Sequence, residues 1–305
     1  MATPMKAISQ SDFDYVRDLV RRHSAIVLEA DKDYLIETRL ATLVRRTGLA
    51  SLQELMTCLR THSVAGLDRQ VVEAIATHET SFFRDLHPFE ALGSTVLPEL
   101  IARRPPGQSV TIWCAACSSG QEPFSVAMLA RERFPELVAE RRLRIIATDL
   151  SAAILARARE GWYSQIEISR GLPAGLRAKY FDHQGTHWRI RSEIRGMVEF
   201  QQHNLAAPWP SFPPLDLIFM RNVLIYFGLD TRKAILARVR EVLRPDGYLF
   251  LGSSETTLHL DAAFEPVATG KALYYRPRSP DVWQVSAPLR EPPGAGNDDI
   301  IDNAP

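Results

Sequence analysis

A strand, a tight turn and a helix in direct succession constrain the fold of this 305-residue chain most strongly. The apolar run at 110–116 leads into Cys-Ser-Ser-Gly at 117–120, and a helical pattern follows from Glu122. A turn of small residues that feeds a helix leaves backbone N–H groups free to bind an anion. In the same chain, a second apolar strand (144–149) ends in Asp149, an acid placed to hold a ribose diol. The two features together predict a site for a nucleoside cofactor.

The glycine content of the turn argues against a dinucleotide. The pattern G-x-G-x-x-G is absent, and a turn with the single Gly120 suits a smaller anion such as a carboxylate. Glu122 is then either a simple helix cap or a partner for the positively charged part of the cofactor. Asp149 is either a ribose ligand or the N-cap of the helix that follows it.

Cys114 and Cys117 form a C-x-x-C pair inside this stretch. A zinc site would need further ligands, and no second cysteine pair exists in the sequence. A redox pair would open its helix directly, whereas two serines and a glycine intervene. We therefore expect these cysteines to be small apolar fillers of the turn.

The chain divides into regions of different periodicity. Residues 1–76 predict a helical domain, with caps at Ser11 or Asp12, at Asp31 or Asp33, and at Ser51. Residues 77–90 predict a linker that contributes to the cofactor site. From about residue 91 to 277, strands alternate with helices, which predicts an α/β fold with a doubly wound, mostly parallel sheet and a closing hairpin near 264–275.

Two stretches interrupt this alternation. Short β-like pieces within 161–200 predict a small inserted β-subdomain, and we assign the pieces at 188–191 and 197–200 to it. A turn is expected at 244–247, before a strand over 248–253. Residues 278–305 are rich in Pro, Gly, Asp and Asn and predict a disordered tail.

Polar residues lie where ligands bind in such a sheet. The apolar strand at 215–220 ends in Arg221 and Asn222, with Tyr226 shortly after. Ligands of open sheets bind at the carboxyl ends of strands, so all three are expected to face one crevice, although Tyr226 is as well explained by core filling. In the linker, Thr80 and Arg84 are four residues apart and would share a face of a helical turn.

The overall composition limits the possible partners. The formal net charge is zero, which gives no general attraction to nucleic acid or an anionic membrane. No apolar run approaches the ~20 residues of a membrane-spanning helix, and the N-terminus lacks a signal-peptide core. Three cysteines fit a reducing compartment, so we expect a cytoplasmic protein.

These segments together resemble the CheR family, the S-adenosylmethionine-dependent methyltransferases that modify glutamates of bacterial chemoreceptors. The resemblance extends from about residue 8 to 277. Its motifs are Thr-His-Glu-Thr-Ser-Phe-Phe-Arg at 77–84, Trp-Cys-Ala-Ala-Cys-Ser-Ser-Gly-Gln-Glu-Pro-Phe-Ser at 113–125, Ala-Thr-Asp-Leu-Ser at 147–151, Asn-Leu at 204–205, Arg-Asn-Val-Leu-Ile-Tyr-Phe at 221–227 and Leu-Gly-Ser-Ser-Glu at 251–255.

The resemblance implies a Rossmann-like methyltransferase domain and a set of site residues. Tyr226 would lie near the transferred methyl group, and it is the one residue to which the resemblance gives a catalytic place. The implied cofactor-binding residues are His78, Thr80, Arg84, Glu122, Asp149, Asn204, Leu205, Arg221 and Asn222. The implied partner is the cytoplasmic helical domain of a chemoreceptor, which Arg39, Arg45 and Arg46 would steer electrostatically, unless they belong to an ordinary solvated helix face.

Some features depart from the family or favour other functions. His78 stands where asparagine is frequent, and it adds a potential pH dependence. In some members of the family the inserted β-subdomain docks a peptide at the receptor's C-terminus through a glycine-rich loop. The corresponding loop here is shorter and holds only Gly185, so we expect no dependence on such a tethering peptide. We also expect a monomer. His183 and His187 lack a third ligand nearby in sequence, so we expect no metal. A nucleic-acid methyltransferase would carry Asn/Asp-Pro-Pro-aromatic after the fourth strand, where this chain has Arg-Asn-Val-Leu. A non-catalytic module that binds the cofactor and docks a partner remains the alternative.

Overall fold

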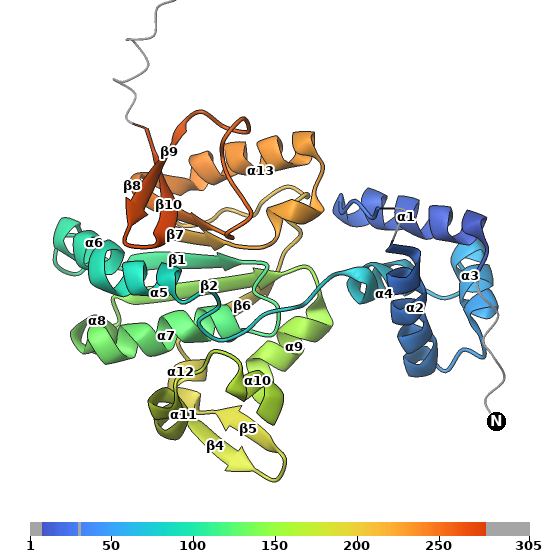
Figure 1. Ribbon diagram of the computed structural model, residues 1–305, viewed down its shortest axis with the longest axis horizontal. Coiled ribbons are helices and arrows are strands. Elements are labelled where there is room, and N and C mark those ends of the chain that lie inside the picture. The colour runs from blue at the N-terminus through green and yellow to red at the C-terminus, as the bar shows by residue number, and fades with distance from the viewer. Residues whose placement is uncertain (1–7, 30–31, 279–305) are drawn as a thin grey trace, which may run out of the picture.

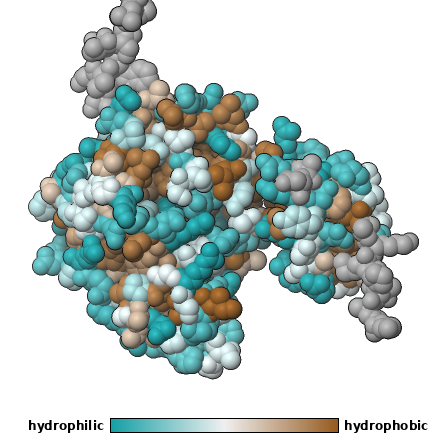
Figure 2. Space-filling model, viewed as in Figure 1, coloured by the Kyte–Doolittle hydropathy of each residue, from teal (hydrophilic) through white to brown (hydrophobic). Residues whose placement is uncertain are grey.

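Four helices form a small N-terminal lobe. The computed structural model describes residues 8–29 and 32–278. Figure 1 shows this lobe beside the larger sheet-containing lobe, and Figure 2 shows the two joined at a narrow waist. Leucine, valine and isoleucine side chains from all four helices fill its core, as the helical periodicity predicts. The helices are α1 (Gln10–Ser24), α2 (Asp33–Thr47), α3 (Leu52–Thr61) and α4 (Leu67–Ile75).

The helix ends agree in part with the predicted caps. The cap of α1 is Ser9, not Ser11 or Asp12; the Ser9 hydroxyl accepts the Asp12 N–H and the Asp12 carboxylate accepts the Ser9 N–H. Ser9 and Asp12 thus form a capping box, in which the side chain of each accepts the backbone N–H of the other. A helix that began at Ser11 or Asp12 would lose both of these hydrogen bonds. Helix α2 begins at Asp33, but its N-cap is Lys32, whose side chain makes no capping hydrogen bond; Asp31 lies outside the described residues. Ser51 caps α3 as expected.

A seven-stranded sheet forms the centre of the larger lobe. Its spatial order is β6-β2-β1-β7-β8-β10-β9, and the first five strands are parallel. The hairpin β9–β10 closes one edge in antiparallel pairing, as predicted. The strands are β1 (Val110–Ala115), β2 (Leu143–Asp149), β6 (Val198–Gln202), β7 (Leu215–Met220), β8 (Leu243–Leu251), β9 (Phe264–Thr269) and β10 (Ala272–Pro277).

Helices cover both faces of this sheet, so the fold is doubly wound (Figure 1). Alternate residues of β1 point to opposite faces: Ile112 packs in the core with α5–α7, and Trp113 packs in the core with α13. The chain crosses from one side of β1 to the other between β6 and β7, which makes the β1/β7 boundary the topological switch point. The helices of this lobe are α5 (His87–Ala91), α6 (Leu97–Arg103), α7 (Gln121–Arg133), α8 (Pro135–Ala139), α9 (Ala152–Glu160), α10 (Gln165–Ser169), α11 (Ala174–Tyr180), α12 (Ser192–Arg195) and α13 (Leu229–Val242), with a π-helical turn, Leu92–Val96, between α5 and α6.

The inserted subdomain is smaller than predicted. Its three-stranded antiparallel sheet has the order β3-β5-β4, with β3 (Trp162–Ser164), β4 (Phe181–Gln184) and β5 (His187–Ile190). The piece at 197–200 was assigned to it wrongly, because β6 pairs in parallel with β2 and extends the central sheet. A short apolar strand gives no sign of its pairing partner in the local sequence, which explains the error.

The predicted turn at 244–247 lies within β8 rather than before it. Leu243 pairs with Leu215, and the next pair joins Tyr248 to Leu217, so the residues between bulge out of the ladder. Strand β8 therefore begins earlier than the predicted strand over 248–253.

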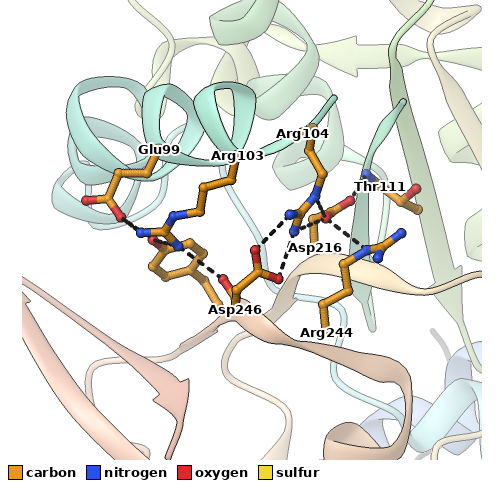
Figure 3. A network of polar contacts seen from close by, with 8 residues as sticks. Glu99, Arg103, Arg104, Thr111, Asp216, Arg244 and Asp246 are labelled. Atoms are coloured by element: carbon orange, nitrogen blue, oxygen red, sulfur yellow. Dashed lines mark hydrogen bonds and ion pairs between the residues drawn. The ribbon is translucent and has the colours of Figure 1, made fainter. Parts of the chain in front are cut away.

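A polar network braces the end of the sheet where β7 begins (Figure 3). Asp216 is fully buried; it accepts the Arg104 Nε–H at 2.6 Å and the backbone N–H of Thr111 at 2.7 Å, and Arg244 lies 3.2 Å away. Asp246 accepts two further bonds from Arg104. The network ties α6, β1, β7 and β8 together at the end of the strands opposite the candidate site.

No helix in residues 8–29 and 32–278 has the length and apolar character needed to cross a bilayer. The predicted tail at 278–305 lies outside the described residues, except for residue 278.

Candidate active site

A cavity lies at the carboxyl ends of β1, β2 and β7, between the two lobes. This is the switch point of the sheet, where ligands of such folds bind. The ten residues proposed for the cofactor and the methyl group come from five separate segments, and the structure brings all ten to this cavity. They are His78, Thr80, Arg84, Glu122, Asp149, Asn204, Leu205, Arg221, Asn222 and Tyr226.

The turn after β1 has the conformation that its small residues allow. Ala116, Ser118 and Gly120 all adopt positive φ angles, of 55°, 52° and 92°. A Cβ atom on Gly120 would lie 2.9 Å from the ring of Phe124, so glycine is needed both for the angle and for the close approach. The Ser118 hydroxyl donates to the carbonyl of His78 at 2.8 Å, which ties the turn to the interdomain linker.

Asp149 is buried at the end of β2 and is held by backbone groups. Its two carboxylate oxygens accept the N–H of Ser118 at 2.8 Å and that of Ser151 at 3.0 Å. Ser151, not Asp149, caps α9, because its hydroxyl accepts the N–H of Ile154. Burial raises the pKa of Asp149, and these hydrogen bonds oppose the rise. The carboxylate is therefore fixed in the cavity with lone pairs left for hydroxyl donors.

Arg221 connects three parts of the site. It donates to Glu122 at 3.1 Å, to the Asp85 carboxylate at 2.6 Å and to the carbonyl of Arg84 at 2.9 Å. Burial raises the pKa of Glu122, and the charge of Arg221 opposes the rise. The Arg221 Nε is buried and has no hydrogen-bond partner within the described residues. An unsatisfied buried donor beside a buried acid fits a ligand that carries both negative and positive groups.

The linker enters the cavity without forming a helix. Residues 77–81 are irregular and a turn follows, so the prediction that Thr80 and Arg84 share a helical face was wrong. Phe83, Asp85 and Leu86 adopt positive φ angles, which are strained for residues other than glycine. The pair of Asp85 with Arg221 holds this strained turn against the site.

Two of the predicted residues also brace the lobes. An imidazole nitrogen of His78 lies 3.2 Å from the carbonyl of Glu73, and the Asn204 amide donates to the carbonyl of His23 at 2.8 Å. Helix α1 and the end of α4 are thus fastened to the larger lobe through cavity-lining side chains.

The sequence reasoning missed the part of the cavity that the N-terminal lobe supplies. Ser24 and Ile26 line it, and the backbone of Ile26 pairs with that of Phe227 in an isolated antiparallel bridge. The N–H of Val27 donates to the carbonyl of Tyr226 at 2.9 Å. No local sequence signal marks this contact, because its partners are about 200 residues apart in the chain.

The three predicted steering arginines differ in their surroundings. Arg45 and Arg46 are exposed, whereas Arg39 is half-buried and donates to the carbonyl of Ile75 and, at 3.2 Å, to the Thr77 hydroxyl. Arg39 therefore does not belong to a freely solvated face. Burial lowers its pKa, and Tyr226 is close enough to oppose that shift electrostatically. Arg39 and Arg46 line a second cleft, between α2, α4 and α9.

Neither the cysteines nor the subdomain histidines form a metal site in the part of the chain that the structure describes. Cys114 and Cys117 are buried unpaired thiols, and burial raises the pKa of each well above its ordinary value. His183 packs against the ring of Trp188.

Comparison with known families decides the identity of the chain. Residues 78–273 match the family described as "CheR methyltransferase, SAM binding domain", and residues 11–75 match "CheR methyltransferase, all-alpha domain". The chain belongs to the CheR methyltransferase family. It is 40% identical over 271 residues to chemotaxis protein methyltransferase 1 of Pseudomonas aeruginosa, covering 88% of this chain and 98% of the relative. It is 39% identical over 268 residues to chemotaxis protein methyltransferase Cher2 of Pseudomonas putida, covering 87% and 97%.

Membership confirms the predicted cofactor, fold class and general activity. This CheR methyltransferase uses S-adenosylmethionine and acts in chemotaxis. The cavity fits that cofactor on its own geometry. Asp149 suits the ribose hydroxyls, Glu122 suits a positive group, and the unsatisfied Arg221 Nε suits a carboxylate.

Proposed function

We propose that this CheR methyltransferase transfers the methyl group of S-adenosylmethionine to glutamate side chains in the cytoplasmic helical domain of chemoreceptors, as a cytoplasmic enzyme. Unpaired positive charge around Tyr226 carries the proposal. Arg39 donates to the neutral oxygens of Ile75 and Thr77, and Tyr226 lies close enough to feel its charge. Among the described residues, no carboxylate forms an ion pair with Arg39 within 4.0 Å. A carboxylate acceptor gains from such a site, whereas an amine acceptor does not.

The chemistry asks little of the protein beyond positioning. A glutamate carboxylate is already ionised at neutral pH, so no base has to remove a proton. One carboxylate oxygen attacks the methyl carbon, a C–O bond forms as the C–S bond breaks, and the methyl ester and S-adenosylhomocysteine result. Bound S-adenosylmethionine supplies the electrophilic methyl group. The chain aligns the two reactants and excludes water, and we place Tyr226 beside the transferred group.

We propose the remaining cavity residues as the cofactor site, with roles that follow from their surroundings. Asp149 accepts from the ribose hydroxyls, and Glu122 faces the positively charged end of the cofactor. Arg84 and Arg221 hold the anionic end, and Asn222 borders it. His78, Thr80, Asn204 and Leu205 shape the remaining wall, in part through the backbone because the Asn204 amide is already bonded to His23.

The cleft between α2, α4 and α9 supports a route for the acceptor. Arg39 and Arg46 line it, and Arg45 is exposed on the same helix. Receptor helices rich in glutamate would be attracted to this basic side, which lies next to the cavity through the shared residue His78. We expect Arg46→Glu to raise the KM for receptor several-fold and to leave the affinity for S-adenosylhomocysteine unchanged.

We propose that the enzyme is a monomer that works without a receptor tethering peptide. The β4–β5 hairpin supports the tether independence, because its connection holds only Gly185 and Thr186. Removing the C-terminal residues of the receptor should leave the methylation rate unchanged. A loss of more than tenfold would contradict tether independence.

The decisive experiment uses radiolabelled S-adenosylmethionine and receptor-containing membranes. We expect label in the receptor that is released as methanol by base, because a glutamate methyl ester is base-labile. Asp149→Asn should abolish transfer, whereas the exposed Asp182→Asn should not. Tight cofactor binding with no transfer to any receptor would refute the enzyme and favour the non-catalytic docking module.

A further inference from the structure

The segment that follows β8 has so far been given no role. It holds the motif Leu-Gly-Ser-Ser-Glu at 251–255, and its last residue, Glu255, is only 8% exposed although it lies in a loop. A buried carboxylate in a loop is costly unless it is fully hydrogen-bonded. Its partners therefore indicate what it does.

Four backbone N–H groups donate to this one carboxylate. Oε2 accepts from Asn222 and Gly252, each at 2.7 Å. Oε1 accepts from Val223 at 2.8 Å and from Ile225 at 3.2 Å. Three of the four donors belong to residues 222–225, which lead from β7 to Tyr226.

This segment has an unusual path that local hydrogen bonds do not fix. Asn222 adopts a positive φ of 56°, and a single 3-10 turn, Leu224–Tyr226, follows. The first N–H groups of a helical turn have no partner within the turn. The carboxylate of Glu255 satisfies them from the loop after β8, 30 to 32 residues further along the chain.

We propose that Glu255 is a positioning residue of the methyl-transfer site. Its carboxylate accepts backbone N–H groups of residues 222–225 and so fixes the path of this segment. The path in turn determines the positions of Asn222 beside the cofactor and of Tyr226 beside the methyl group. The inference rests on the proposed function for the part that concerns methyl transfer. The part that concerns the shape of the segment stands on the hydrogen bonds alone.

Gly252 supports this assignment from the other side of the contact. A Cβ atom on Gly252 would lie 2.6 Å from the Asn222 amide nitrogen, 2.8 Å from the Asn222 backbone nitrogen and 2.8 Å from Glu255 Oε2. The φ of Gly252 is not positive, so glycine is required here by space rather than by backbone conformation. The two chain segments are thus packed as closely as their backbones permit.

The test compares Glu255→Gln with the control Glu265→Gln, which alters an exposed residue of β9. The amide keeps the shape of the side chain, but its NH2 group cannot accept hydrogen bonds from N–H donors. We expect hydrogen exchange of amides 222–226 to accelerate at least tenfold in Glu255→Gln only. We expect kcat to fall at least tenfold and the KM for receptor to change less than twofold.

Binding stoichiometry separates positioning from unfolding. If the substitution merely unfolded a fraction of the molecules, S-adenosylhomocysteine would titrate fewer sites, and kcat per titrated site would be normal. We expect full stoichiometry, a several-fold weaker affinity and a low kcat per site. Unchanged exchange in residues 222–226, or a normal kcat per site, would overturn the proposal.

A second variant covers the case in which Glu255→Gln does not fold. Gly252→Ala keeps the carboxylate but forces a methyl group against Asn222, and we expect the same exchange and kcat changes. Normal exchange in Gly252→Ala would then overturn the proposal. If the unmodified enzyme transfers no methyl group to receptors, the proposed substrate is refuted, and the exchange and S-adenosylhomocysteine affinity of the variants still decide the role of Glu255.

Discussion

Replacing Asp216 by Asn should destabilise the catalytic lobe without altering the cavity. The carboxylate of Asp216 is fully buried, and its three partners are Arg104, Arg244 and the N–H of Thr111 (Figure 3). Each carboxylate oxygen of Asp216 accepts from an N–H donor. In asparagine one of these oxygens is replaced by an NH2 group, which cannot accept a hydrogen bond and would face an N–H donor. Arg104 keeps its pair with Asp246, which limits the loss.

The expected size of the effect follows from these contacts. Removing one partner of a buried ion pair costs about 3–5 kcal/mol, and the surviving pair with Asp246 places this case near 3 kcal/mol. In a lobe of about 200 residues, that loss lowers the midpoint of thermal unfolding by roughly 6–12 °C.

Urea unfolding followed by circular dichroism measures the change, with S-adenosylhomocysteine affinity measured below the transition. The control is Asp182→Asn, which breaks an exposed pair with Arg191 and should cost about 0.5 kcal/mol or less. We expect the cofactor affinity of Asp216→Asn to be unchanged, because Arg221 lies at the other end of β7. A loss below about 1 kcal/mol, equal to the control, would refute the reasoning that this carboxylate is structurally required.

Three further predictions concern the site. Burial raises the pKa of Glu122 above its ordinary value, so cofactor affinity should fall as the pH drops through that raised pKa and the acid takes up a proton. Glu122→Gln should bind the cofactor weakly, with an affinity that depends less on pH. If calorimetry gave this variant the same slope of affinity against pH as the unmodified enzyme, the prediction would be contradicted. The same raised pKa makes ionisation of Glu122 unfavourable for the folded state, so cofactor-free enzyme should lose stability as the pH rises through it. A thiol reagent should modify one cysteine, Cys58, in native protein and three after denaturation, because the pair in the β1 turn is buried; rapid modification of three native thiols would disprove that.

The sequence was sufficient for features that depend on local chemistry. The strand, turn and helix around Gly120 form as predicted, because each residue satisfies a local requirement of angle or burial. The cavity-lining residues at the strand ends could be proposed because the carboxyl ends of parallel strands meet at one edge. The resemblance added His78, Asn204 and Leu205.

Features that depend on distant partners were missed or misassigned. Strand β6 was placed in the subdomain because its pairing with β2 is invisible locally. Arg39 was predicted to steer the receptor, with an ordinary solvated helix face as the alternative, but its guanidinium donates to the carbonyl of Ile75, which lies 36 residues away at the end of α4. Glu255 was noticed within a motif, yet its purpose appears only when four N–H groups converge on it in the folded chain.

The backbone bridge between Ile26 and Phe227 bears on how this architecture can be taken apart. A helical lobe joined by a linker would ordinarily be an interchangeable adapter, which evolution or an engineer could exchange to redirect the enzyme. Here a graft that removed the lobe would also leave the carbonyl of Tyr226 without the N–H of Val27, and would open one wall of the cavity. The lobe and the cavity therefore form one structural unit, and under the proposed function a new target would have to be reached by changes on the surface of the lobe rather than by its replacement.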